Sequence, residues 1–307
     1  MLSIKKEMNL IKVEKEPYVY RFSWIQLARP MTFTGTISPI LAGTGLAALK
    51  GQINLGNFII LLLATLLIQT ATNMLNDYYD FRNGQDQEKW TVKSETGPAH
   101  QAVPVIAGTL LVIAALLGMW LAIHSTPWII LAGVCGIIFG YLYSAGSRPL
   151  CSLGLGEFVA AIFLGFMTTS LAYVVQGFPM DSDILSVSLP FALLIASMIL
   201  TNNIRDIEKD RPFRRTLAIV FGRKKAVLLL AMIVALAYLW IVTLILTSAV
   251  SWLSVVVILA LPIAIKLGWN LRNNASKAEK TNSMKLAAIH HWVFGLLFAC
   301  SIWMGLL

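Results

Sequence analysis

The stretch Asn73-Met-Leu-Asn-Asp77-Tyr-Tyr-Asp80-Phe-Arg-Asn-Gly-Gln-Asp86 closes an apolar run that begins near Asn57. Asn73, Asp77 and Asp80 are spaced i, i+4 and i+7, so on an α-helix they share one face. Carboxylates placed this way repel one another unless a cation lies between them. Oxygen ligands on one helix face suit Mg²⁺, although a helix end that emerges into water with solvated acids gives the same pattern.

A second apolar run ends in the same way. The run 185–200 is followed at 201–211 by Thr-Asn-Asn-Ile-Arg-Asp-Ile-Glu-Lys-Asp-Arg. Asn202, Asp206 and Asp210 are spaced i, i+4 and i+8, which again predicts one shared helix face. Two apolar helices that each end in Asn and two Asp, with basic residues behind, favour a shared site over solvated acids.

The composition places the chain among polytopic membrane proteins. It has 307 residues, of which 57% are hydrophobic and 13% charged, and its mean hydropathy is +0.74. The net charge of +9 does not indicate binding to nucleic acid, because in a membrane protein the location of basic residues matters more than their sum. Three cysteines without a CxxC pair predict no disulfide framework and no metal site.

Hydrophobic stretches of about 20 residues predict an all-α protein with nine membrane-spanning helices. No Gly-, Pro- or Ser-rich linker divides them, so we expect one intramembrane domain over 31–307, preceded by a cytoplasmic lead-in over 1–30. The predicted spans are Met31–Leu49, Asn57–Asn76, Val103–Ile123, Trp128–Ser144, Leu153–Val175, Leu185–Asn203, Ala226–Leu246, Trp252–Leu267 and Leu286–Leu306.

The basic residues predict how the chain is oriented in the cytoplasmic membrane. With the N-terminus inside, every Lys and Arg except Lys50 falls on a segment predicted to be cytoplasmic. This positive-inside bias, with nine spans, predicts a cytoplasmic N-terminus and an external C-terminus. Both aspartate clusters then lie at the cytoplasmic ends of the second and sixth helices, where they can form one site that faces the cytoplasm.

Two acidic clusters beside a ring of Arg and Lys suit Mg²⁺ together with a polyanion, because carboxylates bind the metal and cations neutralise phosphate oxygens. The site would open into an apolar bundle, which fits a ligand with a diphosphate head and a long hydrocarbon tail. The sequence has no GxxxxGK[ST] loop for a nucleotide. An ion-coupled carrier also uses intramembrane acids, but it would place them near the bilayer midplane.

The two motifs resemble those of the UbiA superfamily of intramembrane prenyltransferases. The resemblance runs from about Trp24 to the C-terminus, and it is closer to the 1,4-dihydroxy-2-naphthoate polyprenyltransferases of menaquinone synthesis. The residues that carry it are Asn-Asp-Tyr-Tyr-Asp-Phe-Arg-Asn-Gly-Gln-Asp (76–86), Gly-Tyr-Leu-Tyr-Ser (140–144), Asn-Asn-Ile-Arg-Asp-Ile-Glu-Lys-Asp-Arg (202–211) and Thr-Leu-Ala-Ile-Val-Phe-Gly (216–222).

The resemblance implies Mg²⁺-dependent transfer of a polyprenyl group from its diphosphate to an aromatic acceptor, within membrane lipid. Asp77, Asp80, Asp206 and Asp210 would hold Mg²⁺, which helps the allylic C–O bond to ionise. Other candidates are amides that orient those carboxylates or bind phosphate, basic residues that contact diphosphate or only set topology, and one aromatic ring near the allylic cation: Asn73, Asn202, Asn203, Arg205, Lys209, Arg214, Arg215 and Tyr143.

Alternatives to the naphthoate acceptor stay open. A superfamily enzyme could use 4-hydroxybenzoate, homogentisate or haem, although the pattern Asn-Asn-x-Arg-Asp at 202–206 favours naphthoate. A non-catalytic isoprenoid-binding protein is a further alternative, because the loops at 95–101 and 212–215 depart from the pattern usual in the family. The sequence indicates neither prenyl chain length nor oligomeric state.

Overall fold

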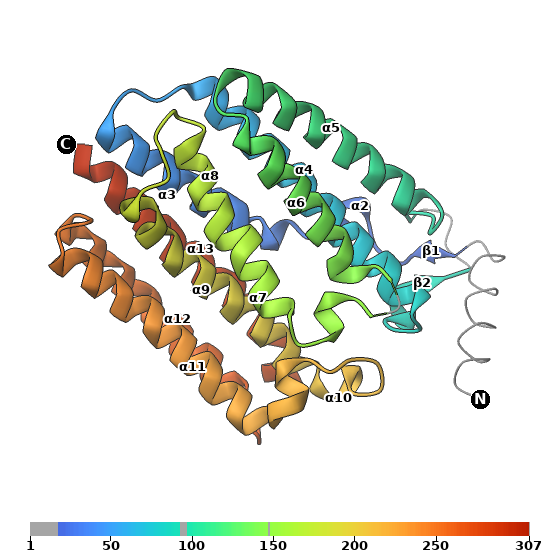
Figure 1. Cartoon of the computed structure of the whole chain (residues 1–307). Coiled ribbons are helices and arrows are strands. Elements are labelled where there is room, and N and C mark those ends of the chain that lie inside the picture. The colour runs from blue at the N-terminus through green and yellow to red at the C-terminus, as the bar shows by residue number, and fades with distance from the viewer. Residues whose placement is uncertain (1–17, 93–96, 147, 307) are drawn as a thin grey trace.

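The structure, a computed structural model, describes residues 18–92, 97–146 and 148–306. These residues form an elongated helical bundle, with strand β1 at one end and the last turn of helix α13 at the other (Figure 1). The first half comprises β1 (Val19–Tyr20), α2 (Trp24–Ala28), η1 (Pro30–Thr32), α3 (Thr34–Lys50), α4 (Leu55–Arg82), η2 (Gln87–Lys89), β2 (Trp90–Thr91), α5 (Ala102–His124) and α6 (Trp128–Ser144).

The second half of the bundle begins with a short 3₁₀ turn and ends in the C-terminal helix. Its elements are η3 (Leu150–Ser152), α7 (Gly156–Ala160), the π-helical segment η4 (Ala161–Met167), α8 (Thr168–Val174), α9 (Ser182–Arg205), α10 (Ile207–Asp210), α11 (Leu217–Leu246), η5 (Trp252–Ala260), α12 (Leu261–Asn270), α13 (Lys277–Trp303) and η6 (Met304–Leu306).

Seven helices of the described chain are long and apolar enough to cross a membrane. The segment Trp24–Thr32 with α3 makes an eighth if this pair, bent by 45°, is one span, and α6 is a shorter apolar helix of 17 residues. Each predicted span falls on helix. The prediction of an all-α polytopic membrane protein is therefore confirmed, whereas nine crossings and the N-in, C-out orientation stay predictions.

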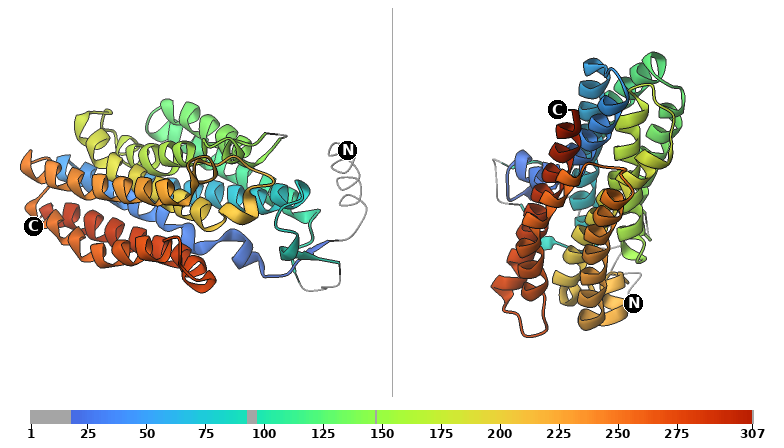
Figure 2. Two further views of the ribbon diagram at one scale, coloured as in Figure 1. Left: turned by 90° about the horizontal axis from the view of Figure 1, so that it is seen from below. Right: turned by 90° about the vertical axis from the view of Figure 1, so that its left-hand side faces the viewer.

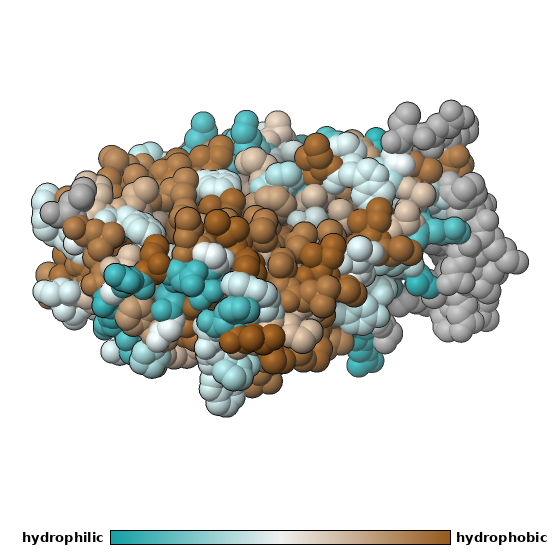
Figure 3. Space-filling model, turned by 90° about the horizontal axis from the view of Figure 1, so that it is seen from above, coloured by the Kyte–Doolittle hydropathy of each residue, from teal (hydrophilic) through white to brown (hydrophobic). Residues whose placement is uncertain are grey.

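The outer surface of the bundle suits lipid. Large apolar side chains are exposed along its helices, among them Val112, Leu116, Leu228 and Leu239. Hydrophobic residues dominate the middle of the face seen in Figure 3. A soluble monomer rarely exposes so much contiguous apolar surface, so the surface supports a multi-pass membrane protein.

Polar side chains fix several helix ends. Asn54 caps α4, Asp181 caps α9 and Thr216 caps α11, each by accepting a hydrogen bond from a backbone N–H in the first turn. Ser276 begins α13 with a capping box. Inside α11, Gly222 has a φ of 74°, a conformation that glycine adopts at little cost, and the helix bends there.

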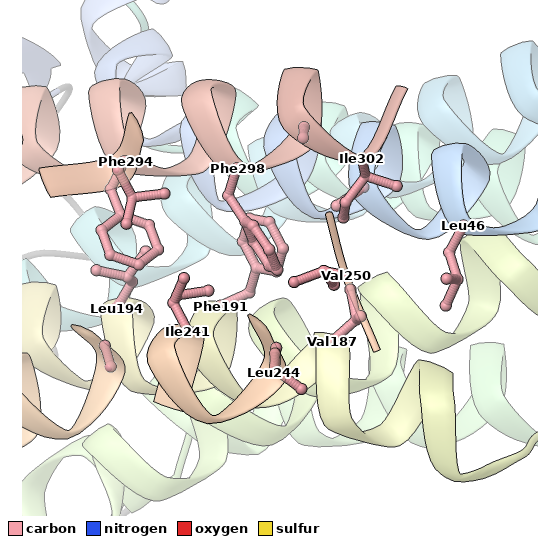
Figure 4. Packing of buried hydrophobic residues seen from close by; sticks show 14 of the residues in the cluster. Leu46, Val187, Phe191, Leu194, Ile241, Leu244, Val250, Phe294, Phe298 and Ile302 are labelled. Carbon is pink, nitrogen blue, oxygen red and sulfur yellow. The ribbon is translucent and has the colours of Figure 1, made fainter. Parts of the chain in front are cut away.

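The core distal to β1 is built mainly from α3, α9, α11 and α13. Phe191 of α9 lies against Phe298 of α13, and residues of α3, α8, α11 and η5 complete the cluster (Figure 4). The π-helical segment packs closely on α9 at Gly165, where an added Cβ would lie 2.4 Å from Cα of Ala192. Because interiors pack near crystal density, this contact needs glycine.

A small sheet closes the opposite end. β1 pairs antiparallel with β2, with Tyr20 opposite Trp90, and Val19 also bridges to Ala99. The strands lie at one end of the bundle (Figures 1 and 2). They hold the start of the described chain against the loop that follows α4. Of the expected lead-in over 1–30, residues 1–17 lie outside the described residues, and the single domain over 31–307 stays a prediction.

Candidate active site

A cavity of about 440 Å³ lies inside the bundle. Most of its wall is apolar and comes from α4, α5, α6, η4 and α9. The polar side of this wall is formed by residues from segments far apart in the sequence, such as Arg29 and Asn203. The polar and aromatic wall residues used below are Arg29, Thr32, Gln69, Asn73, Tyr143, Asn202, Asn203 and Arg214.

Asp77 of α4 is fully buried and follows Asn76, a residue of the cavity wall. Its Oδ1 accepts hydrogen bonds from Nη2 of Arg29 at 2.8 Å and from Nζ of Lys89 at 2.7 Å. Its Oδ2 is buried and has no hydrogen-bond partner among the described residues. One oxygen is therefore neutralised by two cations, and the other can still accept a ligand.

Arg214 joins the two aspartate clusters. Its Nη2 donates to Oδ1 of Asp80 at 2.5 Å, its Nε donates to Gln85 at 2.7 Å, and its Nη1 lies 3.9 Å from Oδ2 of Asp210. Burial and the nearby carboxylates raise the pKa of Asp210 to about 6, although Arg214 opposes this shift. The structure thus brings together carboxylates from helices α4 and α10.

Asp86 forms a second link between the clusters. Lys209 contacts both Asp86 and Glu88, and Lys89 contacts Asp86 at 2.6 Å. Burial alone would raise the pKa of Asp86, but the two lysines outweigh it and hold this pKa well below its usual range. Lys209 belongs to the second cluster and contacts the loop that follows α4, so it links the two clusters.

Asp206 lies at the break between α9 and α10. Arg205 donates to its two oxygens at 2.8 and 2.5 Å and to the amide oxygen of Asn202 at 2.8 Å. The predicted helix face of the second cluster is thus interrupted at Asp206, although the N–H of Asp210 still donates to its carbonyl group at 2.8 Å. Arg205 already neutralises this carboxylate.

The remaining candidate residues divide into wall residues and an exposed one. Asn73 donates to the carbonyl oxygen of Ala28 at 2.9 Å and to Oγ1 of Thr32 at 3.1 Å, so it ties α4 to the segment before α3. Tyr143 borders the cavity. Arg215 is exposed and makes no side-chain ion pair within the described ranges, in contrast to its neighbour Arg214.

A sequence model of the UbiA prenyltransferase family matches residues 36–293. The chain belongs to this family. It is 34% identical to the 1,4-dihydroxy-2-naphthoate octaprenyltransferase of Bacillus subtilis over 90% of this chain and 91% of that one. It is 28% identical to the Mycobacterium tuberculosis protein of the same name, over 92% and 97%. The resemblance stated from the motifs is confirmed, and so is the prediction of a prenyltransferase.

Solved UbiA structures share the fold. A UbiA homologue from Archaeoglobus fulgidus, bound to DMAPP and Mg²⁺, matches with a TM-score of 0.61 at 16% identity, over 90% of this chain and 99% of that one. The apo structure of a UbiA homologue from Aeropyrum pernix K1 matches with a TM-score of 0.66 at 14% identity, over 90% and 98%. The bundle is therefore a UbiA fold.

This UbiA prenyltransferase has a donor set that fits Mg²⁺ in kind. Among the described residues, no three His, Cys, Asp or Glu side chains lie close enough to hold a metal ion together. Arg29, Lys89, Arg214 and Arg205 lie against the carboxylates instead. Carboxylate oxygens are nevertheless hard ligands, and Oδ2 of Asp77 is buried without a partner in the described part of the chain.

Three residues at the site of this prenyltransferase are not among those predicted from the sequence. Arg29 and Lys89 fit the pattern of basic residues that set topology, yet both contact Asp77. Glu157 lies within a predicted span and contacts Asn203 at 2.8 Å. A lone acid inside an apolar run is a signal that could have identified Glu157.

Proposed function

We propose that this UbiA-family enzyme transfers a polyprenyl group from polyprenyl diphosphate to 1,4-dihydroxy-2-naphthoate, with Mg²⁺, as a step of menaquinone biosynthesis. The observation that carries the proposal is a cavity with an apolar wall that meets two acidic clusters and their basic partners at one end. The names of the Bacillus subtilis and Mycobacterium tuberculosis relatives support the naphthoate acceptor.

In this proposal the head of the donor substrate lies among the charged residues. Asp77, Asp80, Asp206 and Asp210 would hold Mg²⁺, which would draw charge onto the leaving diphosphate when bound. Arg29 and the other cations that now pair with these carboxylates are the natural contacts for phosphate oxygens, since a guanidinium group matches phosphate as well as carboxylate geometry. The other such cations are Lys89, Arg205 and Arg214.

The hydrocarbon tail would lie in the apolar part of the cavity. From Asn73 to Leu61 the cavity follows α4 for twelve residues, which is roughly 18 Å of helix. The apolar wall would keep water from the reacting allylic carbon. Tyr143 borders the cavity, and its ring face is our candidate for stabilising positive charge on that carbon.

The proposed site faces the cytoplasm at the cytoplasmic membrane. The basic segments around Lys89, Lys209 and Arg214 lie at the same end of the bundle as β1 and α10 (Figure 1), and basic residues favour the cytoplasmic side. Diphosphate substrates made in the cytoplasm would reach the site there. Labelling of single cysteines introduced near β1 and near η6 in intact cells would test this orientation.

Prenyl transfer by the purified full chain in detergent tests the function. We expect product from a polyprenyl diphosphate and 1,4-dihydroxy-2-naphthoate with Mg²⁺, and none without the metal or in Asp77→Ala and Asp206→Ala. Asp183→Ala is the matched control, because Asp183 begins α9 at the far end and pairs with Lys50. Product only with another aromatic acceptor would reject the naphthoate assignment. Diphosphate binding without product from any acceptor would favour a non-catalytic role.

A further inference from the structure

The mechanism proposed above makes no use of Glu157, a carboxyl group inside the bundle. Glu157 lies in the first turn of α7, and 4% of its surface is exposed. Its Oε1 accepts a hydrogen bond from Nδ2 of Asn203 at 2.8 Å, and its Oε2 is buried without a partner in the part of the chain described. A buried carboxyl group with so few partners is costly, and in a membrane span it suggests a function.

This contact determines how the Asn203 amide is turned. Because Nδ2 of Asn203 donates to Oε1 of Glu157, the carbonyl oxygen of the same amide is directed away from Glu157. Asn203 borders the cavity together with Val159 and Ala160 of α7. The amide oxygen of Asn203 is therefore the polar atom that this side chain offers to the cavity.

An amide oxygen selects among the chemical groups that enter the cavity. It accepts hydrogen bonds, so it opposes phosphate oxygens, which are also acceptors, and it gains nothing from a hydrocarbon tail. A phenolic hydroxyl group of the aromatic acceptor is a donor and matches it. Tyr143 lies nearby, since a Cβ added to Gly156 would be 3.3 Å from its hydroxyl oxygen, so an aromatic wall residue lies beside the start of α7.

We propose that Glu157 is a positioning residue: it holds Asn203 with the amide oxygen toward the cavity, where this oxygen accepts a hydrogen bond from a phenolic hydroxyl group of the aromatic acceptor. The inference rests on the proposed prenyl transfer to such an acceptor. It gives Asn203 a role at the acceptor and replaces the expectation that this amide orients the aspartates or binds phosphate.

Steady-state kinetics of the full chain in detergent tests the inference. Glu157→Gln keeps an accepting oxygen, so we expect its KM for the acceptor to stay within about threefold of wild type. Glu157→Met and Asn203→Leu each remove the contact, so we expect the acceptor KM to rise about tenfold. The KM for polyprenyl diphosphate should not change, whereas a merely structural role would lower the amount of active enzyme without this difference between substrates.

An acceptor analogue provides the matched control. Methylation of the hydroxyl group that Asn203 binds should raise the KM of wild type about tenfold and should raise that of Asn203→Leu no further, because coupled groups are not additive. Asn203→Leu carries the comparison alone if Glu157→Met does not fold. If methylation raises the acceptor KM by the same factor in wild type and in Asn203→Leu, the inference is overturned.

Two other results would overturn it. If Glu157→Gln raises the acceptor KM as much as Glu157→Met does, the carboxyl group acts as a proton acceptor and not by positioning. If Asn203→Leu changes the Mg²⁺ requirement and leaves the acceptor KM unchanged, Asn203 serves the metal. Transfer by wild type with unaltered acceptor KM in the variants rejects this inference alone, whereas no transfer to any phenolic acceptor rejects the proposed function together with it.

Discussion

Replacing Arg214 by Gln tests whether one guanidinium group holds the two aspartate clusters together. Arg214 donates to Asp80 at 2.5 Å and lies 3.9 Å from Asp210, and the three side chains are each about one-tenth exposed. Removing one partner of a buried ion pair costs about 3–5 kcal/mol, because the other charge stays buried. We expect Arg214→Gln to lower the melting temperature of the metal-free protein by roughly 5–15 °C.

Arg215→Gln is the matched control. It removes the same charge at the next residue, where the side chain is exposed. Melting would be followed by tryptophan fluorescence in one detergent, first with a chelator and then with Mg²⁺. Since Arg214→Gln leaves Asp80 and Asp210 without their cation, Mg²⁺ should stabilise this variant more than wild type. Equal melting temperatures for the two variants would refute the argument that Arg214 links the clusters.

Changes at Asp77, Gly165 and His100 test the site and the packing around it. Asp77→Asn should lower the transfer rate by about 10²–10³-fold in a product assay, while Asp183→Asn should not. Gly165→Ala should lower the free energy of unfolding by about 1–3 kcal/mol, since its methyl group meets the α9 backbone. Gly108→Ala is the control, because a methyl group there meets nothing within 4 Å. Burial lowers the pKa of His100 to about 4. The contribution of His100 to the free energy of unfolding should therefore be constant above pH 6.5 and fall toward pH 4, as melting temperatures measured across this range would show. His100→Phe should reduce that fall.

Much of the fold could be predicted because a bilayer imposes its thickness on the sequence. Each long apolar run had to form a helix, and the runs that end in Asp77 and Asp206 were visible from spacing alone. The break at Asp206 and the bend before Thr34 were not visible. At the break Asp206 pairs with its neighbour Arg205, and beside the bend Arg29 contacts Asp77 of α4; helix spacing alone indicates neither pairing.

The partners of the aspartates could not be predicted from spacing. Arg214 and Arg215 are adjacent and were both candidates, yet only Arg214 turns inward to Asp80. Arg29 lies 48 residues from Asp77 in sequence, and nothing local distinguishes it from a basic residue that sets topology. Such pairings are decided by which helix faces meet, and a single sequence carries that information only weakly.

The contact between Arg214 and Asp80 affects how the protein folds during its own translation, because 134 positions separate the two residues. At about 5–20 residues per second, a ribosome completes α4 roughly 7–27 seconds before it adds Arg214. During that interval Arg29 and Lys89 can already neutralise Asp77, but Asp80 has not yet met its cation. A nascent chain arrested between these two points would expose an uncompensated acid at the membrane, which is the kind of intermediate that insertion factors shelter and membrane proteases remove.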